Sequence, residues 1–125
     1  KRIHFMCYPP PLPLYKESSI MIMASKYEGW PMVLMEGQQM GVIPISYNSF
    51  ESITDIITNE YNGIIIPNNN IKVFIKRLKA LMDNPAKREQ MAINAIQFSN
   101  KNTKDQTVDQ YLNLFKTALN ESNPK

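Results

Sequence analysis

The chain has 125 residues, 43% of them hydrophobic, which suits one compact domain with a buried core. Its formal net charge of +3, from 14 Lys and Arg residues against 11 Asp and Glu residues, is too small to indicate a nucleic-acid partner. The single cysteine, Cys7, excludes an internal disulfide and fits a reducing compartment, and the apolar runs are too short to span a membrane, so we expect a cytoplasmic location.

Four short apolar segments have the character of β-strands. The first is IHFM, and a proline-rich loop leads from it into one turn of helix over residues 14–17. The others are continuous apolar runs bounded by turn residues, which is typical of strands that are buried on both faces. The predicted strands cover residues 3–6, 20–24, 42–46 and 63–66.

Helical patterns separate these strands and fill the rest of the chain. Pro31 has a favourable position at the start of a helix and Gly41 a favourable position after its end, which predicts a helix over residues 32–40. The segment 49–57 supports a short helix, and Asn70 is a candidate N-cap for the next one. The remaining helices are predicted from apolar residues at helical spacing and cover residues 71–82, 86–98 and 105–119.

Buried strands separated by helices predict a parallel sheet with crossover connections. The expected fold class is therefore α/β: a Rossmann-like open parallel sheet with flanking helices and a helical C-terminal half. We expect a single domain over residues 1–125, with an α/β part over 1–83 and C-terminal helices over 84–120. The chain starts abruptly with a strand-like segment and no initiator Met, so we also expect it to be part of a longer protein.

Two glutamates in the segment EGWPMVLME are the candidate functional residues. Ligands of open parallel sheets bind beyond the carboxyl ends of the strands, and Glu28 follows directly from the predicted strand 20–24. The next helix is apolar on nearly every side in its first turns, so we expect Glu36 to be buried. An unsatisfied buried polar group costs about 2–7 kcal/mol, and a charge costs more, so Glu36 needs a partner or a ligand such as ribose hydroxyls.

The start of that helix offers a second binding element. Its free N–H groups and its dipole favour an anion such as a phosphate, and Pro31 has no N–H, so Trp30, Met32 and Val33 would supply the amides. Glu36 lies roughly 7–8 Å further along the axis, at ~1.5 Å per residue. A diphosphate at the helix start would then have a ribose near Glu36 and a second sugar near Glu28. These are the parts of a nucleotide sugar.

The order of these motifs resembles the C-terminal domain of GT-B glycosyltransferases, specifically glycosyltransferase family 4. In that family a segment S-x-x-E-G-[FL]-P-x-x-x-x-E-A follows a buried strand, then come a Gly/Pro segment and an Asn-Gly segment, and the likeness extends over nearly the whole chain. The matching residues are Ser25, Glu28, Gly29, Pro31, Glu36, Gly41, Pro44, Asn62 and Gly63.

The resemblance implies a role for each candidate residue. Glu36 would hold the ribose hydroxyls, and Glu28 would hold the hydroxyls of the donor sugar, which makes Glu28 the catalytic candidate. The amides after Gly29 would bind the distal phosphate or the sugar. The implied substrate-binding set is Glu28, Gly29, Trp30, Met32, Val33 and Glu36. The family retains the anomeric configuration and usually needs no metal, so no metal ligand and no cofactor are expected beside the nucleotide-diphosphate sugar.

The chain also departs from the family pattern. Gly37 replaces the usual Ala after the second glutamate, and Cys7 stands where the family often has Gly. The Arg and Lys that neutralise the leaving diphosphate lie upstream in the family, as does the acceptor domain, and Lys1 and Arg2 are too close to the first predicted strand to replace them. We therefore expect the chain alone to bind poorly and to catalyse nothing.

The implied partners of the intact enzyme are a nucleotide-sugar donor and a sugar or lipid-linked acceptor, in polysaccharide or glycoconjugate synthesis. Peripheral contact with the inner face of the cell membrane is a further expectation, for which the basic run 76–79 is the candidate against an ordinary solvated helix face.

Other interpretations of the same residues stay open at this stage. Glu28 is also compatible with an ordinary loop carboxylate, Glu36 with a buried acid paired to a structural lysine, and Trp30 with a core anchor instead of a wall of a sugar pocket. A receiver-like signalling module has a similar length, but it would carry clustered acidic residues at the strand ends, where this chain has MAS and PIS. A non-enzymatic interaction domain that inherited the fold is the other alternative.

Overall fold

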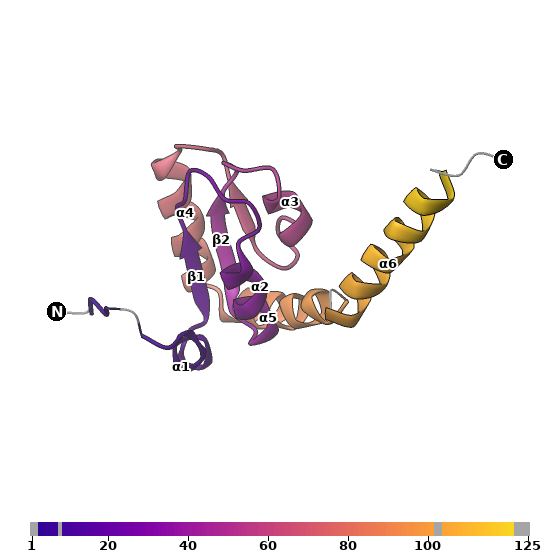
Figure 1. Cartoon of the computed structure of the whole chain (residues 1–125). Helices are drawn as coiled ribbons and strands as arrows, with labels where there is room; N and C mark the ends of the chain where they lie inside the picture. Colours follow the sequence, from indigo (N-terminus) through magenta and orange to yellow (C-terminus); the bar gives the residue numbers. More distant parts are fainter. Residues whose placement is uncertain (1–2, 8, 102–103, 122–125) are drawn as a thin grey trace.

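The fold is an open three-stranded sheet with helices around it (Figure 1). The structure is a computed structural model that describes residues 3–7, 9–101 and 104–121, so Lys1 and Arg2 lie outside the described residues. Its strands are β1 (Ile20–Met23), β2 (Ile43–Tyr47) and β3 (Ile64–Ile66). Its helices are α1 (Pro11–Glu17), α2 (Met32–Gln39), α3 (Ile53–Ile56), α4 (Ile71–Met82), α5 (Pro85–Asn100) and α6 (Lys104–Glu121).

Neighbouring strands of the sheet run parallel, in the order β1-β2-β3. In this register Ile45 of β2 lies opposite Ile22 of β1 and Ile64 of β3. Parallel strands need a crossover connection between them, and the two crossovers contain α2 and α3. The predicted α/β class, an open parallel sheet with flanking helices, is therefore confirmed.

Apolar side chains cover both faces of the sheet, because successive strand residues point to opposite sides. One face packs against α4 and α5 through Ile43, Ile45, Ile64, Ile66, Phe74, Leu81 and Met91. The other face packs against α2 and the α3 segment through Met21, Met23, Ile65, Leu34, Met35, Ile53, Ile56 and Ile57. Full burial of a side chain of this size contributes about 1.5–3 kcal/mol, so these two clusters provide the main stabilising energy.

Helix α5 connects the two sides of the molecule. It contacts α4, β2 and α2, and in Figure 1 it crosses the sheet at the end where the strands begin. Gly41, which follows α2 with a φ of 77°, lies beside Ala92 and Ile96 of α5. This positive φ is the left-handed conformation that favours glycine after a helix, as predicted. The opposite end of the sheet is left to the loops that follow β1 and β2.

A buried polar network fixes α2 against the turn before β3. Gln38 of α2 donates to the carbonyl oxygen of Ile56 (3.1 Å), and Asn62 donates to the same oxygen (3.1 Å) and to Gln38 Oε1 (3.2 Å). Asn62 Oδ1 accepts from the amide of Thr58 at 2.7 Å. Gln38 and Asn62 are fully buried, and a lost partner would leave a desolvated polar group at a cost of about 1–3 kcal/mol.

The predicted strand over residues 3–6 is wrong. No strand within the described part of the chain pairs with this segment, and Phe5 is 96% exposed. The apolar residues of IHFM suggested burial, but a strand exists only where a neighbour accepts and donates its backbone hydrogen bonds. The chain instead enters α1, which is longer than the predicted turn because Pro11 and Pro13 fall in its first turn, where a missing N–H costs nothing.

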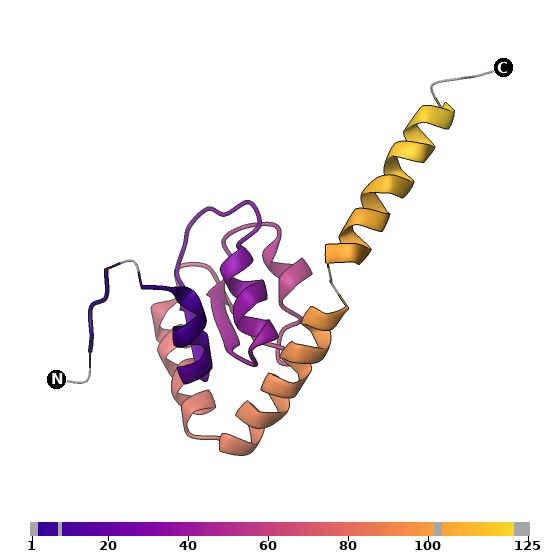
Figure 2. The same cartoon turned by 60° about the horizontal axis from the view of Figure 1, so that its bottom comes forward.

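The other predicted strands and helices are confirmed within a few residues at each end. The largest shift is at α3, which covers only part of the predicted segment 49–57. The last helix, predicted over 105–119, extends away from the rest of the molecule (Figure 2). Its large apolar side chains are all exposed: Val108, Tyr111, Leu112, Leu114, Phe115 and Leu119.

We expect the backbone amides of α6 to exchange with solvent faster than those of β1. The reason is that α6 lacks buried side chains along its described length, so it can open locally without disturbing the core. Hydrogen exchange measured by mass spectrometry on the 125-residue chain checks this. Equal protection of α6 and β1 would contradict the prediction.

Gly63→Ala should destabilise the fold by about 1–3 kcal/mol, the usual cost of overpacking. A Cβ at this position would lie 2.7 Å from Pro44 Cγ, 2.8 Å from the Pro44 carbonyl oxygen and 2.9 Å from Ile57 Cγ2. Because that oxygen belongs to the backbone of β2, it has little freedom to move. Urea unfolding provides the measurement. Gly29→Ala is the matched control, since a Cβ there meets nothing within 4 Å, and the prediction fails if both variants unfold like the parent.

Candidate functional site

The loop between β1 and α2 contains the first of the candidate residues, and two serines hold it in place. Ser49 Oγ donates to the carbonyl oxygen of Ser25 at 2.7 Å, and Ser52 Oγ donates to that of Gly29 at 2.6 Å. Both serines come from the segment after β2. The loops at the carboxyl ends of these two neighbouring strands are therefore tied together, which gives the start of α2 a fixed position at that edge of the sheet.

Helix α2 begins without a side-chain cap. Pro31 is the N-cap, one residue before the predicted position, and its carbonyl oxygen accepts from the amide of Leu34 at 3.0 Å. The first amides of a helix have no acceptor inside the helix, and here no side chain replaces it. The amides of Met32 and Val33 belong to this group, and both residues are exposed. An anion could reach them from solvent.

The expectation that Glu36 is buried is wrong. Helix α2 buries one face, through Leu34, Met35, Gly37 and Gln38, and Glu36 lies on the exposed face with Met32 and Val33. The prediction failed because apolar residues occupy both faces of the first turns of α2. Only one of these two faces packs against the α3 segment and the sheet. The alternative of a structural lysine as the partner of Glu36 is also wrong, since the described partner is a tyrosine.

Tyr15 of α1 is that partner, and sequence reasoning missed it. Its hydroxyl donates to Glu36 Oε2 at 3.0 Å, while only 8% of the residue is exposed. Burial, the hydrogen bond and the negative charge of Glu36 together raise the pKa of Tyr15 to about 12, so the phenol stays protonated and remains a donor near neutral pH. Among the described residues, Glu36 Oε1 has no hydrogen-bond partner.

The structure brings the candidate residues together on one exposed surface. Glu28, Gly29, Trp30, Met32, Val33 and Glu36 all lie in this loop or in the first turns of α2, and all are exposed. The Glu28 carboxylate has no hydrogen-bond or ion-pair partner in the part of the chain that the structure describes. Trp30 is 49% exposed, so it is not a core anchor. The surface thus combines two accessible carboxylates, an aromatic ring and free amides.

The departure at Gly37 has a local explanation. A Cβ at this position would meet the terminal methyl group of Met21, which is the flexible end of a side chain. Met21 therefore fills the space that the methyl group of an alanine would take.

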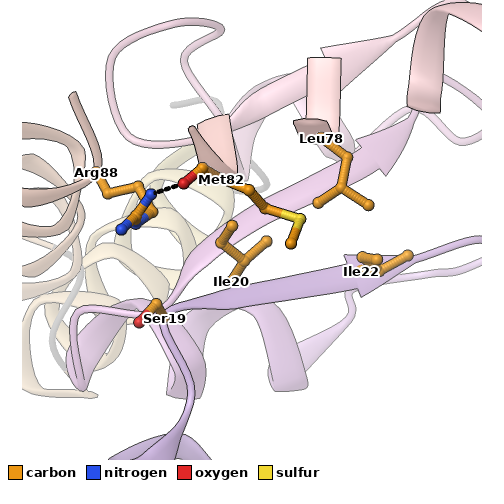
Figure 3. Close-up of a pocket in the computed structure, with 6 residues that line it drawn as sticks. All are labelled: Ser19, Ile20, Ile22, Leu78, Met82 and Arg88. Carbon is orange, nitrogen blue, oxygen red and sulfur yellow. Dashed lines mark hydrogen bonds between the residues drawn. The ribbon is translucent and has the colours of Figure 1, made fainter. Parts of the chain in front are cut away.

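One cavity of the described residues lies elsewhere. It has a volume of about 400 Å³ and is lined by Ser19, Ile20, Ile22, Leu78, Met82 and Arg88. Figure 3 shows these side chains beside β1, with Arg88 hydrogen-bonded to the carbonyl oxygen of Met82. Arg88 also donates to the carbonyl oxygen of Leu81 at 2.9 Å, so it caps the end of α4. None of the candidate residues lines this cavity.

The described ranges lack two other kinds of site. No group of three or more His, Cys, Asp and Glu side chains there is placed to hold a metal ion. None of the helices there combines the length and the apolar character needed to cross a membrane.

Comparisons with known proteins agree on one family. Residues 2–98 match the family model described as "Glycosyl transferases group 1". The chain is 31% identical over 78 residues to an uncharacterized glycosyltransferase of Haemophilus influenzae, covering 62% of this chain and 22% of that protein. It is 29% identical over 70 residues to a UDP-Gal:alpha-D-GlcNAc-diphosphoundecaprenol alpha-1,3-galactosyltransferase of Escherichia coli, covering 56% and 18%. The matches thus cover about a fifth of each curated relative.

The fold is also similar to that of a solved structure. This is the crystal structure of the C-terminal domain of a glycosyl transferase group 1 family protein, LpcC, from Francisella tularensis. The TM-score is 0.67 at 20% sequence identity, and the match covers 79% of this chain and 51% of that one. At this identity the likeness concerns the fold alone.

The contact between Tyr15 and Glu36 predicts a dependence of stability on pH. The pKa of Tyr15 is about 12 in the folded state and about 10 when the group is unperturbed. A raised pKa means that the folded state holds the proton more tightly, so this stabilisation is complete below about pH 10 and is lost as the pH rises towards 12.

Urea unfolding from pH 8 to 12 gives the free energy of unfolding of the parent and of Tyr15→Phe. The difference between the two measures this effect, because the contributions of the other titrating groups cancel. The excess stability of the parent should shrink from pH 10 upwards. Glu36→Gln is the control in which two causes of the shift are weakened, so the decline should still begin near pH 10 but should be smaller and end at a lower pH. A difference that is constant up to pH 12 would contradict the assignment.

Proposed function

This chain belongs to the glycosyl transferases group 1 family and has the fold of a GT-B C-terminal domain, and on that premise we propose that it is the donor-binding part of a retaining glycosyltransferase. The reaction is transfer of a sugar from a nucleotide-diphosphate sugar to an acceptor. The bond between the anomeric carbon and the diphosphate oxygen breaks, a bond to the acceptor oxygen forms on the same face of the sugar, and the proton of the acceptor hydroxyl passes to the departing diphosphate. We include membership of glycosyltransferase family 4 in this proposal.

The observation that carries the proposal is the exposed surface at the start of α2. A diphosphate is an anion, and the uncapped helix start offers amides to it, from Trp30, Met32 and Val33. Glu36, one turn along the same helix face, has a free oxygen that suits ribose hydroxyls. Glu28 precedes the helix and has its whole carboxylate available for the hydroxyls of the transferred sugar.

Because Glu36 is exposed, its burial cannot be the reason to expect a ligand. A buried carboxylate would need a ligand to satisfy it, whereas an exposed one can remain hydrated. What supports a ligand here is the clustering of unpaired acceptors and unpaired amides on one surface, together with the apolar side chains of Trp30, Met32 and Val33 exposed beside them. In this proposal the helix amides stabilise the leaving diphosphate, and no metal or cofactor takes part.

The acceptor is proposed from the relatives. The name of the Escherichia coli protein contains a diphosphoundecaprenol-linked sugar, which is a lipid-linked substrate. We propose that the intact enzyme likewise uses a sugar or lipid-linked acceptor, held by another domain, in polysaccharide or glycoconjugate synthesis at the cytoplasmic face of the membrane. The 125-residue chain alone then binds the donor poorly and transfers no sugar.

Glu36→Gln should weaken binding of the nucleoside diphosphate by about 1.5–3 kcal/mol, the usual value of hydrogen bonds to a charged group. Glu28→Gln should leave that affinity nearly unchanged and lower turnover with the complete donor, because Glu28 is assigned to the transferred sugar. Calorimetry and single-turnover kinetics on the longest natural polypeptide that carries this chain separate the two effects.

Glu89→Gln is the matched control, an exposed glutamate of α5 outside the candidate surface. Each variant must still unfold cooperatively. Parental nucleotide affinity in Glu36→Gln, or parental turnover in Glu28→Gln, would overturn the corresponding role. If the parent itself neither binds a nucleoside diphosphate nor transfers a sugar, the chain is better described as a non-enzymatic interaction domain.

A further inference from the structure

The hydrogen bond between Tyr15 and Glu36 connects α1 with α2. Helix α1 precedes the sheet and buries Tyr15, whereas Glu36 lies on the exposed face of α2. The hydroxyl and the carboxylate are 3.0 Å apart and belong to residues that are 21 positions apart in the chain. A buried, immobile donor therefore holds an exposed acceptor. This arrangement differs from an ordinary surface glutamate, which rotates among several rotamers.

The hydroxyl of Tyr15 is not needed for packing. Phenylalanine would fill the same space with its ring, and the one described partner of the Tyr15 hydroxyl is Glu36 Oε2. Burying a hydroxyl without a hydrogen bond is costly, so the phenol and the carboxylate depend on each other. The contact fixes one carboxylate oxygen and leaves Oε1 entirely available, because an ionised carboxylate can accept about four hydrogen bonds.

We propose that Tyr15 is a positioning residue of the donor site, which orients the Glu36 carboxylate so that its remaining acceptors meet the two ribose hydroxyls of the nucleotide. This inference rests on the proposed function, in which Glu36 binds the ribose. Tyr15 does not touch the ligand and acts only through Glu36. Its effect should therefore depend on the ribose hydroxyls and disappear when Glu36 can no longer accept from them.

The test compares two probes on four proteins. The probes are UDP and its 2′,3′-dideoxy analogue, or GDP and its analogue if GDP binds the parent more tightly. The proteins are the parent, Tyr15→Phe, Glu36→Gln and the double variant, each in the longest natural polypeptide that carries this chain. Calorimetry gives the dissociation constants, and Tyr61→Phe, on the turn before β3, is the control for loss of a phenol hydroxyl that does not contact Glu36.

We expect Tyr15→Phe to weaken binding of the ribose-containing probe about three- to tenfold, as for loss of one hydrogen bond, and to leave the dideoxy probe unaffected. In the Glu36→Gln background Tyr15→Phe should have no further effect, since the two residues act as one unit. A purely structural role would weaken both probes equally, so that outcome overturns the inference even if the variant is partly unfolded. Tighter binding in Tyr15→Phe would also overturn it, because the hydroxyl would then compete with the ligand.

The outcomes also separate this inference from the proposed function. If Glu36→Gln weakens the ribose-containing probe and Tyr15→Phe does not, the donor site stands and the positioning role of Tyr15 is wrong. If Glu36→Gln has no effect, the ribose-binding role of Glu36 in the proposed function is wrong and the inference falls with it. If the parent binds neither nucleotide, the inference likewise falls, together with the donor binding on which it rests.

Discussion

The parallel pairing of β1, β2 and β3 is the constraint on which the rest of the structure depends. Because all three strands point the same way, each connection has to pass back over a face of the sheet. The connections through α2 and α3 cover one face in this way, and α4 and α5, which follow the last strand, cover the other. The same pairing places the ends of β1 and β2 at one edge, where the serines after β2 reach the loop after β1. None of the described elements crosses the sheet at that edge, whereas α5 crosses the opposite end, so the candidate surface stays open (Figure 1).

Helix α2 serves the core with one face and the candidate site with the other. Leu34 and Met35 pack against the α3 segment, and Gln38 joins the buried network with Asn62. These contacts fix both the depth and the rotation of the helix, so Glu36 and the first amides are presented to solvent in a defined direction. Rigid support of this kind is what a binding surface needs, because a site that must first become ordered loses part of its binding energy to that ordering.

The sequence was sufficient for the three strands that form the sheet and for the longer helices, whereas α1 and α3 were predicted with other bounds. Strong local signals explain this success: Gly41 after α2, Asn70 as a side-chain cap, and apolar runs between turn residues. The failures have one common cause. Residues 3–6 and Glu36 were both assigned from apolar neighbours, and apolar composition does not say which face meets a neighbour. Tyr15 was missed because its role depends on a contact across 21 positions, and no local pattern encodes it.

The charges of the candidate surface explain why we expect the chain to require additional positive charge to bind a diphosphate tightly. Glu28 and Glu36 each bring a negative charge, Lys26 in the same loop brings one positive charge, and the start of α2 adds the equivalent of about half a positive charge. The balance near the helix start therefore stays slightly negative before an anion arrives. All of these groups are exposed, so salt and water weaken their individual contributions. Tight binding of a nucleoside diphosphate would require further cations and the exclusion of water, which another domain closing over this edge would supply. In the proposed donor site, the chain would therefore provide the acceptors for the hydroxyl groups and a fixed helix start. The domain that closes over this edge would provide the positive charge.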